Sequence, residues 1–223
     1  PPICYRKFHS TESALLHTFD SIYRSADQNK PTFLVSLDLS AAFDTIDHPI
    51  LLNRLSTSFG IQGSALAWLT SYLSDRSQTI RIGSAASGPS NCQSGVPQGS
   101  VLEPILFSLY ISPLGHIISS FNISHQQYAD DSQLYISLVA DSIRASLDRF
   151  EACLSAVRSW LCTNGLCLNP DKSDSIILGT HQRLSTFPAI PAVKIADTDM
   201  NTSNESTSLG IIMDSKLTLD SHI

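Results

Sequence analysis

Apolar residues recur along this chain with two different spacings, which distinguish helices from strands. Between Asp141 and Asn164 the apolar side chains follow one another at steps of three and four residues, and Gly165 supplies a C-terminal cap. Residues 32–39 are apolar almost throughout, which predicts a strand that is covered on both faces. The chain is therefore expected to combine amphipathic helices with buried strands.

The remaining segments predict further helices and short strands in no regular alternation. Ser10, Asp47 and Ser100 are predicted N-caps of three helices, the last through a capping box with Glu103. The three helices are predicted to run to Ala26, Leu55 and Ile111, and another helix is predicted at 66–73. A turn is predicted at 84–88 and a Thr/Ser/Asn-rich loop at 197–208. The predicted strands are 79–82, 90–93, 125–129, 132–138, 175–178 and 209–213. This order predicts an α+β fold.

Composition and charge exclude several classes of protein. Of 223 residues, 14 are Lys or Arg and 20 are Asp or Glu, which gives a net charge of −6. Domains that bind nucleic acid through bulk charge are usually basic, so a polyanionic partner needs local cations or metal ions here. There is no run of about 18 apolar residues and no signal peptide, so we expect no membrane span. Five cysteines without a Cys-x-x-Cys pair predict reduced thiols and an intracellular protein.

Three acidic residues occupy positions where a folded core has little use for them. Asp38 lies near the end of the apolar strand, and Asp130 and Asp131 form the tip of the hairpin at 125–138. Each has an ordinary interpretation, since aspartate favours turns and a strand end can emerge into solvent. If strand and hairpin share a sheet, however, the carboxylates converge, and a pair about 4 Å apart repels by about 4 kcal/mol at an effective dielectric constant of about 20. Such a cluster favours Mg²⁺ or Mn²⁺ and two-metal phosphoryl transfer.

Five segments, in the right order, resemble the sequence motifs of reverse transcriptases from LINE-type (non-LTR) retrotransposons. The matching residues are FLVSLDLSAAFDTIDH (33–48) for motif A, GVPQGSVL (95–102) for motif B, YADD (128–131) for motif C, LNPDKS (168–173) for motif D, and LGI (209–211) through HI (222–223) for motif E and the residues just after it. YADD alone is weak evidence. Five motifs in order, spread over essentially the whole chain, leave little room for coincidence.

The resemblance implies a polymerase palm, with an antiparallel sheet backed by helices, part of the fingers and no thumb. It implies that Asp38, Asp130 and Asp131 hold two Mg²⁺ ions, with Mn²⁺ as an alternative and the Leu39 carbonyl as a further ligand. A primer 3′-hydroxyl then attacks a deoxynucleoside triphosphate, and pyrophosphate leaves. The implied nucleotide contacts are Ser40, Ala41, Ala42, Phe43, Gln98, Gly99, Lys172 and Arg6.

Several of these residues have an ordinary interpretation beside the implied one. Phe43 matches a steric gate that excludes a 2′-hydroxyl, but a buried aromatic ring is more often part of a core. Gln98 would position nucleotide and template, and it also fits a Pro-Gln-Gly turn before a helix. Lys172 would lie near the leaving pyrophosphate, whereas a loop lysine is otherwise simply solvated.

The same resemblance predicts the domain organisation and the partners. Residues 1–31 are expected to be a fingers remnant and residues 32–223 the palm, with a fingers-type helical insertion at about 47–94. The expected partners are an RNA template, a DNA primer and deoxynucleoside triphosphates, in the nucleus and cytoplasm. The fingers, thumb and endonuclease segments of a longer polyprotein are expected to be missing from this chain, which on its own is expected to be inactive.

Two other functions stay open, the first of them because of a departure from motif B. Glu103 stands where the motif usually has glycine, and it adds negative charge near the expected nucleic-acid path. A catalytically inactive, truncated retrotransposon remnant that binds nucleic acid weakly is therefore the main alternative. Independently of Glu103, another member of the broad reverse-transcriptase group, such as a maturase, is a further alternative. The SAAFD stretch (residues 40–44) and the ending from LG (209–210) to HI (222–223) disfavour it.

Overall fold

The computed structural model describes residues 9–188, 190, 192–195, 198–200, 202–220 and 222. Its centre is a four-stranded antiparallel sheet in the order β10-β1-β8-β7. The strands are β1 (Thr32–Leu37), β7 (Ser124–Tyr128), β8 (Asp131–Ser137) and β10 (Asp174–Leu178). The predicted α+β class is thereby confirmed, and strand and hairpin do belong to one sheet.

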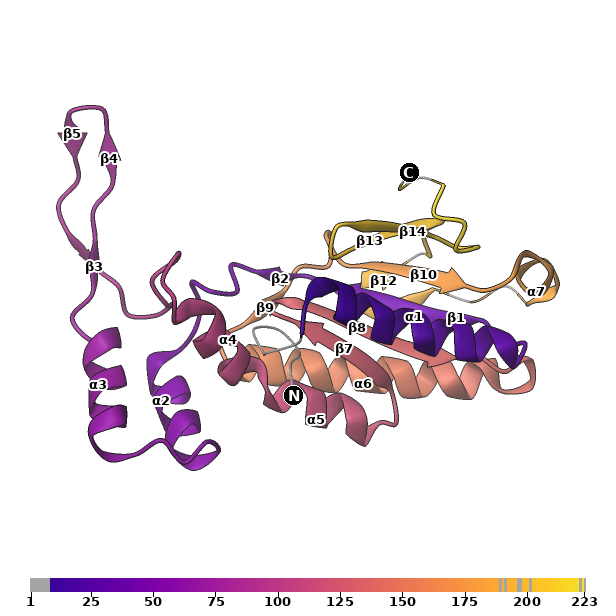
Figure 1. Cartoon of the computed structure of the whole chain (residues 1–223), viewed down its shortest axis with the longest axis horizontal. Coiled ribbons are helices and arrows are strands. Elements are labelled where there is room, and N and C mark those ends of the chain that lie inside the picture. The colour runs from indigo at the N-terminus through magenta and orange to yellow at the C-terminus, as the bar shows by residue number, and fades with distance from the viewer. Residues whose placement is uncertain are drawn as a thin grey trace.

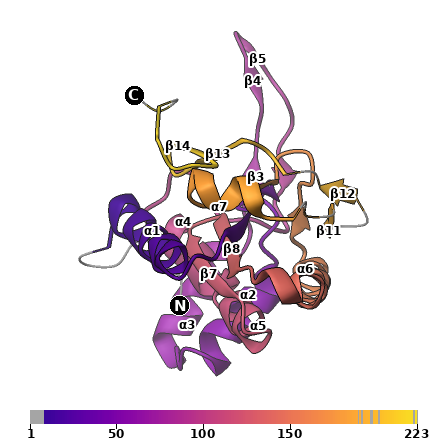
Figure 2. The same cartoon turned by 90° about the vertical axis from the view of Figure 1, so that its right-hand side faces the viewer.

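Helices cover both faces of the sheet (Figures 1 and 2). Alternate residues of β1 point to opposite faces, as a pleated strand requires. Phe33 and Val35 join the larger core with α5 (Pro113–Ser120) and α6 (Ile143–Thr163), and the Phe33 ring lies 5.2 Å from that of Phe150. Leu34 joins a smaller core with Ile22 of α1 (Thr11–Asp27). Burial on both faces explains the continuous apolar run.

The predicted N-caps Ser10 and Asp47 and the predicted C-terminal glycine Gly165 are confirmed. Ser10 caps α1, and its hydroxyl accepts a hydrogen bond from the backbone N–H of Ser13. Asp47 caps α2 (His48–Thr57), with Oδ1 2.8 Å from the amide of Ile50. Gly165 follows α6 with a positive φ of +67°.

Several predicted boundaries are wrong, and the predicted capping box does not form. The strand at 32–39 is divided into β1 and β2 (Leu39–Ser40), and β2 pairs with β9 (Cys167–Leu168) instead of staying in the main sheet. A 3₁₀ turn, η1 (Ala140–Ser142), precedes α6, which therefore starts later than predicted. Leu102, not Ser100, is the N-cap of α4 (Glu103–Ile111). The Glu103 carboxylate accepts a hydrogen bond from the Gly99 amide, while the Ser100 amide donates to the Pro97 carbonyl.

Additional short elements were not predicted. They are α5, α7 (His181–Thr186), β11 (Val193–Ile195), β12 (Thr198–Met200) and β13 (Glu205–Ser208), of which β12 and β13 lie within the predicted loop at 197–208. The last predicted strand is β14 (Ile211–Asp214), which pairs with β13, while β11 pairs with β12. These strands have only three or four residues, which is too short for a clear alternating pattern.

A second lobe extends from one end of the sheet (Figure 1). It contains α2 and α3 (Gly63–Leu73), followed by a narrow ribbon that projects away from the body. The ribbon consists of β3 (Ser77–Gln78) paired with β6 (Ser90–Asn91), and of β4 (Arg81–Ile82) paired with β5 (Ala85–Ala86). The predicted hairpin is thus present. Its pair β4–β5 includes residues 85–86, which were predicted to belong to the turn at 84–88.

A buried cluster around Arg54 fastens this lobe to the sheet domain. The Arg54 guanidinium donates to the Tyr110 carbonyl and to Asn164 Oδ1, the latter at 2.6 Å, and it lies over the rings of Tyr110 and Trp160. The Tyr110 hydroxyl donates to the Asn164 carbonyl at 2.6 Å. Desolvation lowers the pKa of Arg54 and raises the pKa of Tyr110. A single side chain from α2 therefore connects α4 with the end of α6.

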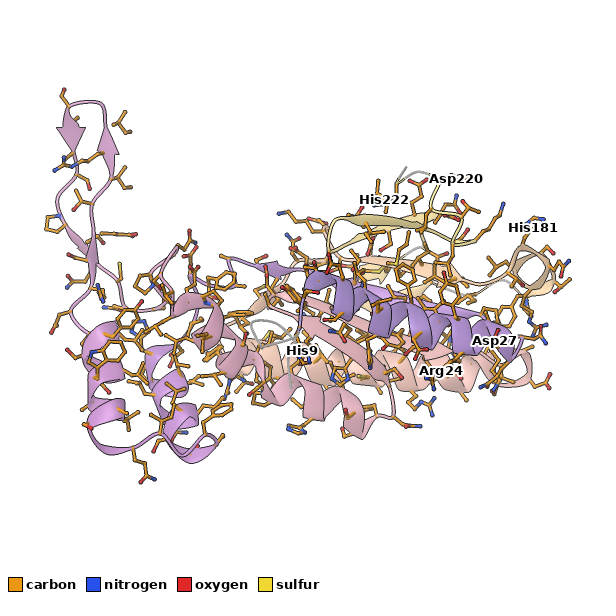
Figure 3. The ribbon with its side chains drawn as sticks, in the orientation of Figure 1. His9, Arg24, Asp27, His181, Asp220 and His222 are labelled. Atoms are coloured by element: carbon orange, nitrogen blue, oxygen red, sulfur yellow. The ribbon has the colours of Figure 1, made fainter. Side chains whose placement is uncertain are left out.

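Replacing Arg54 by Met is expected to destabilise the fold by about 2–3 kcal/mol, because it leaves buried acceptors without their charged donor. Arg24→Met is the matched control, since Arg24 lies on α1 (Figure 3) and forms only an exposed ion pair with Asp20, and such pairs contribute about 0–1 kcal/mol. Urea unfolding of both variants measures the difference. Equal losses in the two variants would show that the cluster does not anchor the lobe.

None of the helices in the described part of the chain is both long and apolar enough to cross a membrane.

Candidate active site at the end of the central sheet

The structure brings the strand end and the hairpin tip together at one end of the sheet. Leu37 of β1 pairs with Ser132 of β8, so Asp38 and Asp131 are the next residues on the two neighbouring strands. Asp130 lies in the turn between β7 and β8, next to Ala129, whose φ is +54°. Residues that face each other across an antiparallel pair share one face of the sheet. The structure therefore places these three residues at the same end of the sheet.

The electrostatics of Asp131 agree with this placement. Its pKa is raised above the ordinary aspartate value, chiefly because the carboxyl is partly desolvated and further because of the charges of Asp130 and Asp38. Like charges at short range have this effect, and a divalent cation would reverse it. An all-oxygen set of three carboxylates suits Mg²⁺ or Mn²⁺. The donor chemistry therefore fits a divalent cation, although no three acidic, His or Cys side chains of the described residues are gathered closely enough to form a ready-made metal site.

The loop that follows Asp38 makes a tight turn through the predicted nucleotide-contacting residues. Ser40 ends β2, Ala42 is buried, and Ala41 has a positive φ of +47°. A left-handed conformation costs a residue with a Cβ roughly 1–2 kcal/mol. The Ala41 carbonyl holds the turn by accepting from the Asp44 amide at 3.0 Å. The main chain here is thus fixed in a conformation that the sequence alone does not suggest.

Phe43 is partly buried, and its ring centre lies 4.7 Å from that of Phe107. It packs against the larger core, so the ordinary interpretation of this residue is correct. The role of a steric gate is compatible with that packing, since a gate must be rigid to exclude a hydroxyl.

The loops of motifs A and B form one unit. Gln98 Nε2 donates to Asp44 Oδ1 at 2.9 Å, and the Val96 amide donates to the Phe43 carbonyl at 3.1 Å. The Gly95 carbonyl accepts from His48 Nε2 at 2.6 Å. Sequence reasoning selected Gln98 but did not assign a role to Asp44 or His48. Both residues lie within the motif A segment (33–48), and this position is the signal that could have identified them.

A cleft of about 800 Å³ is lined by residues of both loops, including Asp44 and Gln98. Arg76, Gln78 and Asn91, at the base of the projecting ribbon, line the same cleft. The cleft was not predicted, because it lies between segments that are about 30–50 residues apart in the sequence.

The other predicted site residues are placed less directly. Lys172 is exposed on the loop after β9, and this loop is bonded to Asp38 through the Asn169 amide. The Gly99 amide is occupied by Glu103. Arg6 lies outside the described residues.

Comparisons with known proteins agree with these motifs. The chain is 27% identical to "Probable RNA-directed DNA polymerase from transposon BS" of Drosophila melanogaster, over 98% of this chain and 24% of that protein. It is 30% identical to the "Retrovirus-related Pol polyprotein from type-1 retrotransposable element R2" of Popillia japonica, over 78% of this chain and 28% of that protein. The expected likeness to non-LTR retrotransposon polymerases is confirmed. The chain spans about a quarter of the length of these relatives.

A solved structure shows the same fold at low sequence identity. A telomerase from Candida tropicalis, in complex with a fragment of telomeric RNA, matches with a TM-score of 0.65 and 14% identity, over 95% of this chain and 32% of that one. The model of the family described as "Reverse transcriptase (RNA-dependent DNA polymerase)" matches residues 3–213. With nearly its whole length covered by that match and its five motifs in order, the chain belongs to the reverse transcriptase family.

Proposed function

We propose that this chain is the palm, with part of the fingers, of an RNA-directed DNA polymerase from a LINE-type retrotransposon. The observation that carries the proposal is the placement of Asp38 directly after β1 and of Asp131 at the start of the neighbouring strand β8, with Asp130 in the adjoining turn. Members of the family generally use divalent metal ions. The proposed division assigns residues 1–31 and the lobe at about 47–94 to the fingers, and the rest of residues 32–223 to the palm.

In this proposal Asp38, Asp130 and Asp131 hold two Mg²⁺ ions, and the Leu39 carbonyl is a further ligand. Bound Mg²⁺ neutralises triphosphate charge and favours ionisation of the attacking hydroxyl. The carboxylates bind and fix the reacting groups, which is the main requirement of phosphoryl transfer. The RNA template, the DNA primer and the deoxynucleoside triphosphate are the proposed substrates.

The remaining residues of the site orient the nucleotide. The main chain at Ser40, Ala41 and Ala42 faces the triphosphate, and Gln98 with Gly99 contacts the nucleotide and the template. Lys172 lies on the loop next to Asp38 and would donate a proton from Nζ to the leaving pyrophosphate. Arg6 keeps its proposed role in the fingers.

Primer extension on an RNA template tests the proposal. We expect this chain, joined to the fingers and thumb segments of a longer polymerase, to extend an annealed DNA primer with deoxynucleoside triphosphates and Mg²⁺, and to stop when the metal is chelated. The chain alone is expected to be inactive. Failure of the joined protein to extend, with an intact fold, would contradict the proposed activity. The joined protein is the one used for every primer-extension measurement.

A catalytically inactive remnant is the second candidate, and the Glu103 contact favours it. The carboxylate occupies the Gly99 amide and places negative charge on motif B. This candidate predicts weak, salt-sensitive nucleic-acid binding without extension. Restoration of extension by Glu103→Gly would identify this residue as the cause of inactivity.

Replacing Phe43 by Val is expected to weaken discrimination against ribonucleotides by roughly 10- to 100-fold, because the ring no longer meets the 2′-hydroxyl. Incorporation of a ribonucleotide and a deoxynucleotide opposite the same template base measures the ratio. Phe107→Leu keeps the Phe43 ring but loosens its packing, so it is expected to weaken discrimination less than Phe43→Val does. Unchanged discrimination in Phe43→Val would limit Phe43 to a packing role.

A further inference from the structure

The backbone pairing of the central strand β1 with β10 stops before Asp38, and the loop at 169–173 is hydrogen-bonded to Asp38 there. The β1–β10 pairing ends at Ser36 and Asp174, and the β2–β9 pairing begins at Leu39 and Leu168. Residues 169–173 therefore lie opposite this break in the pairing and belong to neither strand pair. Asp38 is consequently the point at which one strand pairing is exchanged for another.

The loop binds both backbone polar groups of Asp38. The Asp38 amide donates to the Ser173 hydroxyl at 3.1 Å, and the Asn169 amide donates to the Asp38 carbonyl at 2.9 Å. The Ser173 hydroxyl in turn donates to the Asn169 carbonyl at 2.8 Å. Ser173 is buried, with 8% of its surface exposed. Its single hydroxyl thus accepts and donates at once and closes the loop around Asp38.

These bonds fix the direction of the Asp38 side chain. The amide of Asp38 belongs to the peptide plane before its Cα, and the carbonyl belongs to the plane after it. Holding both planes fixes φ and ψ, and these angles determine where the Cα–Cβ bond points. A carboxylate on a fixed Cβ has fewer arrangements to lose when it binds a cation.

We propose that Ser173 is a positioning residue for Asp38: its buried hydroxyl, hydrogen-bonded to the Asp38 amide and the Asn169 carbonyl, holds this carboxylate in the direction that binds the divalent cation. The inference rests on the proposed polymerase function, in which Asp38 is a metal ligand. Of the hydrogen bonds between the loop and Asp38 described above, only the one from Ser173 uses a side chain. Groups that orient a metal ligand in this way typically change affinity or activity by about 10- to 100-fold when removed.

The test compares three variants of the purified protein. Mn²⁺ binding, followed by electron paramagnetic resonance of the free ion, is expected to weaken by about 10- to 100-fold in Ser173→Ala and to recover in Ser173→Thr, which keeps the hydroxyl. Ser175→Ala is the matched control, because it removes a buried hydroxyl at the position that pairs with Val35. It should bind Mn²⁺ within about threefold of the unsubstituted protein.

Kinetics and hydrogen exchange provide two further measurements, which distinguish the positioning of Asp38 from a purely structural role of Ser173. In primer extension, Ser173→Ala is expected to lower kcat about tenfold while the KM for the nucleotide changes little. In the unsubstituted protein the Asp38 amide proton should exchange slowly with solvent, a measurement that requires no variant. Rapid exchange at Asp38, or unchanged Mn²⁺ affinity in Ser173→Ala, would overturn the positioning role and leave the proposed polymerase intact. Absence of Mn²⁺ binding by the unsubstituted chain, together with absence of extension by the chain joined to its fingers and thumb segments, would instead remove the proposed function itself.

Discussion

Replacing Asp131 by Asn is expected to lower primer extension by at least about 10³-fold, because the site loses one of three carboxylates at its centre. Asp38→Asn and Asp130→Asn should have effects of the same order, since all three lie at the end of one sheet. Asp141→Asn is the control, because Asp141 is exposed in η1 beyond the far end of β8. It should extend primers as the unsubstituted protein does.

The same substitution is expected to make the metal-free protein more stable at neutral pH. The pKa of Asp131 is raised in the folded state by desolvation and by Asp130 and Asp38, so the folded state binds a proton more readily than the unfolded state. Such a group disfavours folding once it is ionised, so stability falls as the pH rises from the ordinary aspartate value through the raised one. Asparagine has no charge and removes this loss. Urea unfolding between pH 3 and pH 7 measures the difference.

Divalent cations should reverse the order of stability. Mg²⁺ at about 100 times its dissociation constant stabilises a folded protein by about 2.7 kcal/mol when only the folded state binds it. The unsubstituted protein is therefore expected to gain stability with Mg²⁺, and Asp131→Asn to gain much less. Equal gains in both proteins would place the cation elsewhere and contradict the role given to Asp131.

The features that sequence reasoning predicted correctly depend on local physics or on two strands with strong patterns. Asp47 is followed at once by a helix with proline in its first turn, so its role as a cap follows from neighbouring residues. The long run before Asp38 is apolar, and β8 contains the apolar Leu134 and Ile136, whereas β7 reads SHQQY and is polar, so the shared sheet depended on β1 and β8. The carboxylate site follows from that sheet.

The features that were missed depend on contacts between distant segments. The division of the predicted strand after Leu37 arises because Leu39 pairs with Leu168, about 130 residues further along. The expected capping box failed because Glu103 reaches back to the Gly99 amide, which local helix rules do not include. The hydrogen bond from Gln98 to Asp44 likewise spans 54 residues. No spacing within either segment predicts such a pair.

Gly95 connects the loops of motifs A and B at their closest approach. Its φ is +83°, and a Cβ at this position would lie 2.8 Å from the Asp44 carbonyl oxygen and 3.0 Å from the Asp44 Cα. The neighbouring atoms belong to the main chain, so they cannot move aside as a flexible side chain can. The Gly95 amide also donates to the Ile46 carbonyl at 2.8 Å, which holds the two segments at this distance.

Gly95→Ala is therefore expected to destabilise the protein by about 3 kcal/mol. This is the sum of two costs: the left-handed backbone conformation of the alanine, and the steric overlap of its Cβ with the Asp44 main chain. Gly83→Ala separates the two causes, because Gly83 has a φ of +60° but no atom within 4 Å of an added Cβ. We expect that variant to lose only about 1 kcal/mol. Because Asp44 holds Gln98, Gly95→Ala should also lower primer extension, whereas Gly83→Ala should leave it unchanged. Equal stability losses in the two variants would mean that the close approach to Asp44 contributes nothing to the joining of the loops.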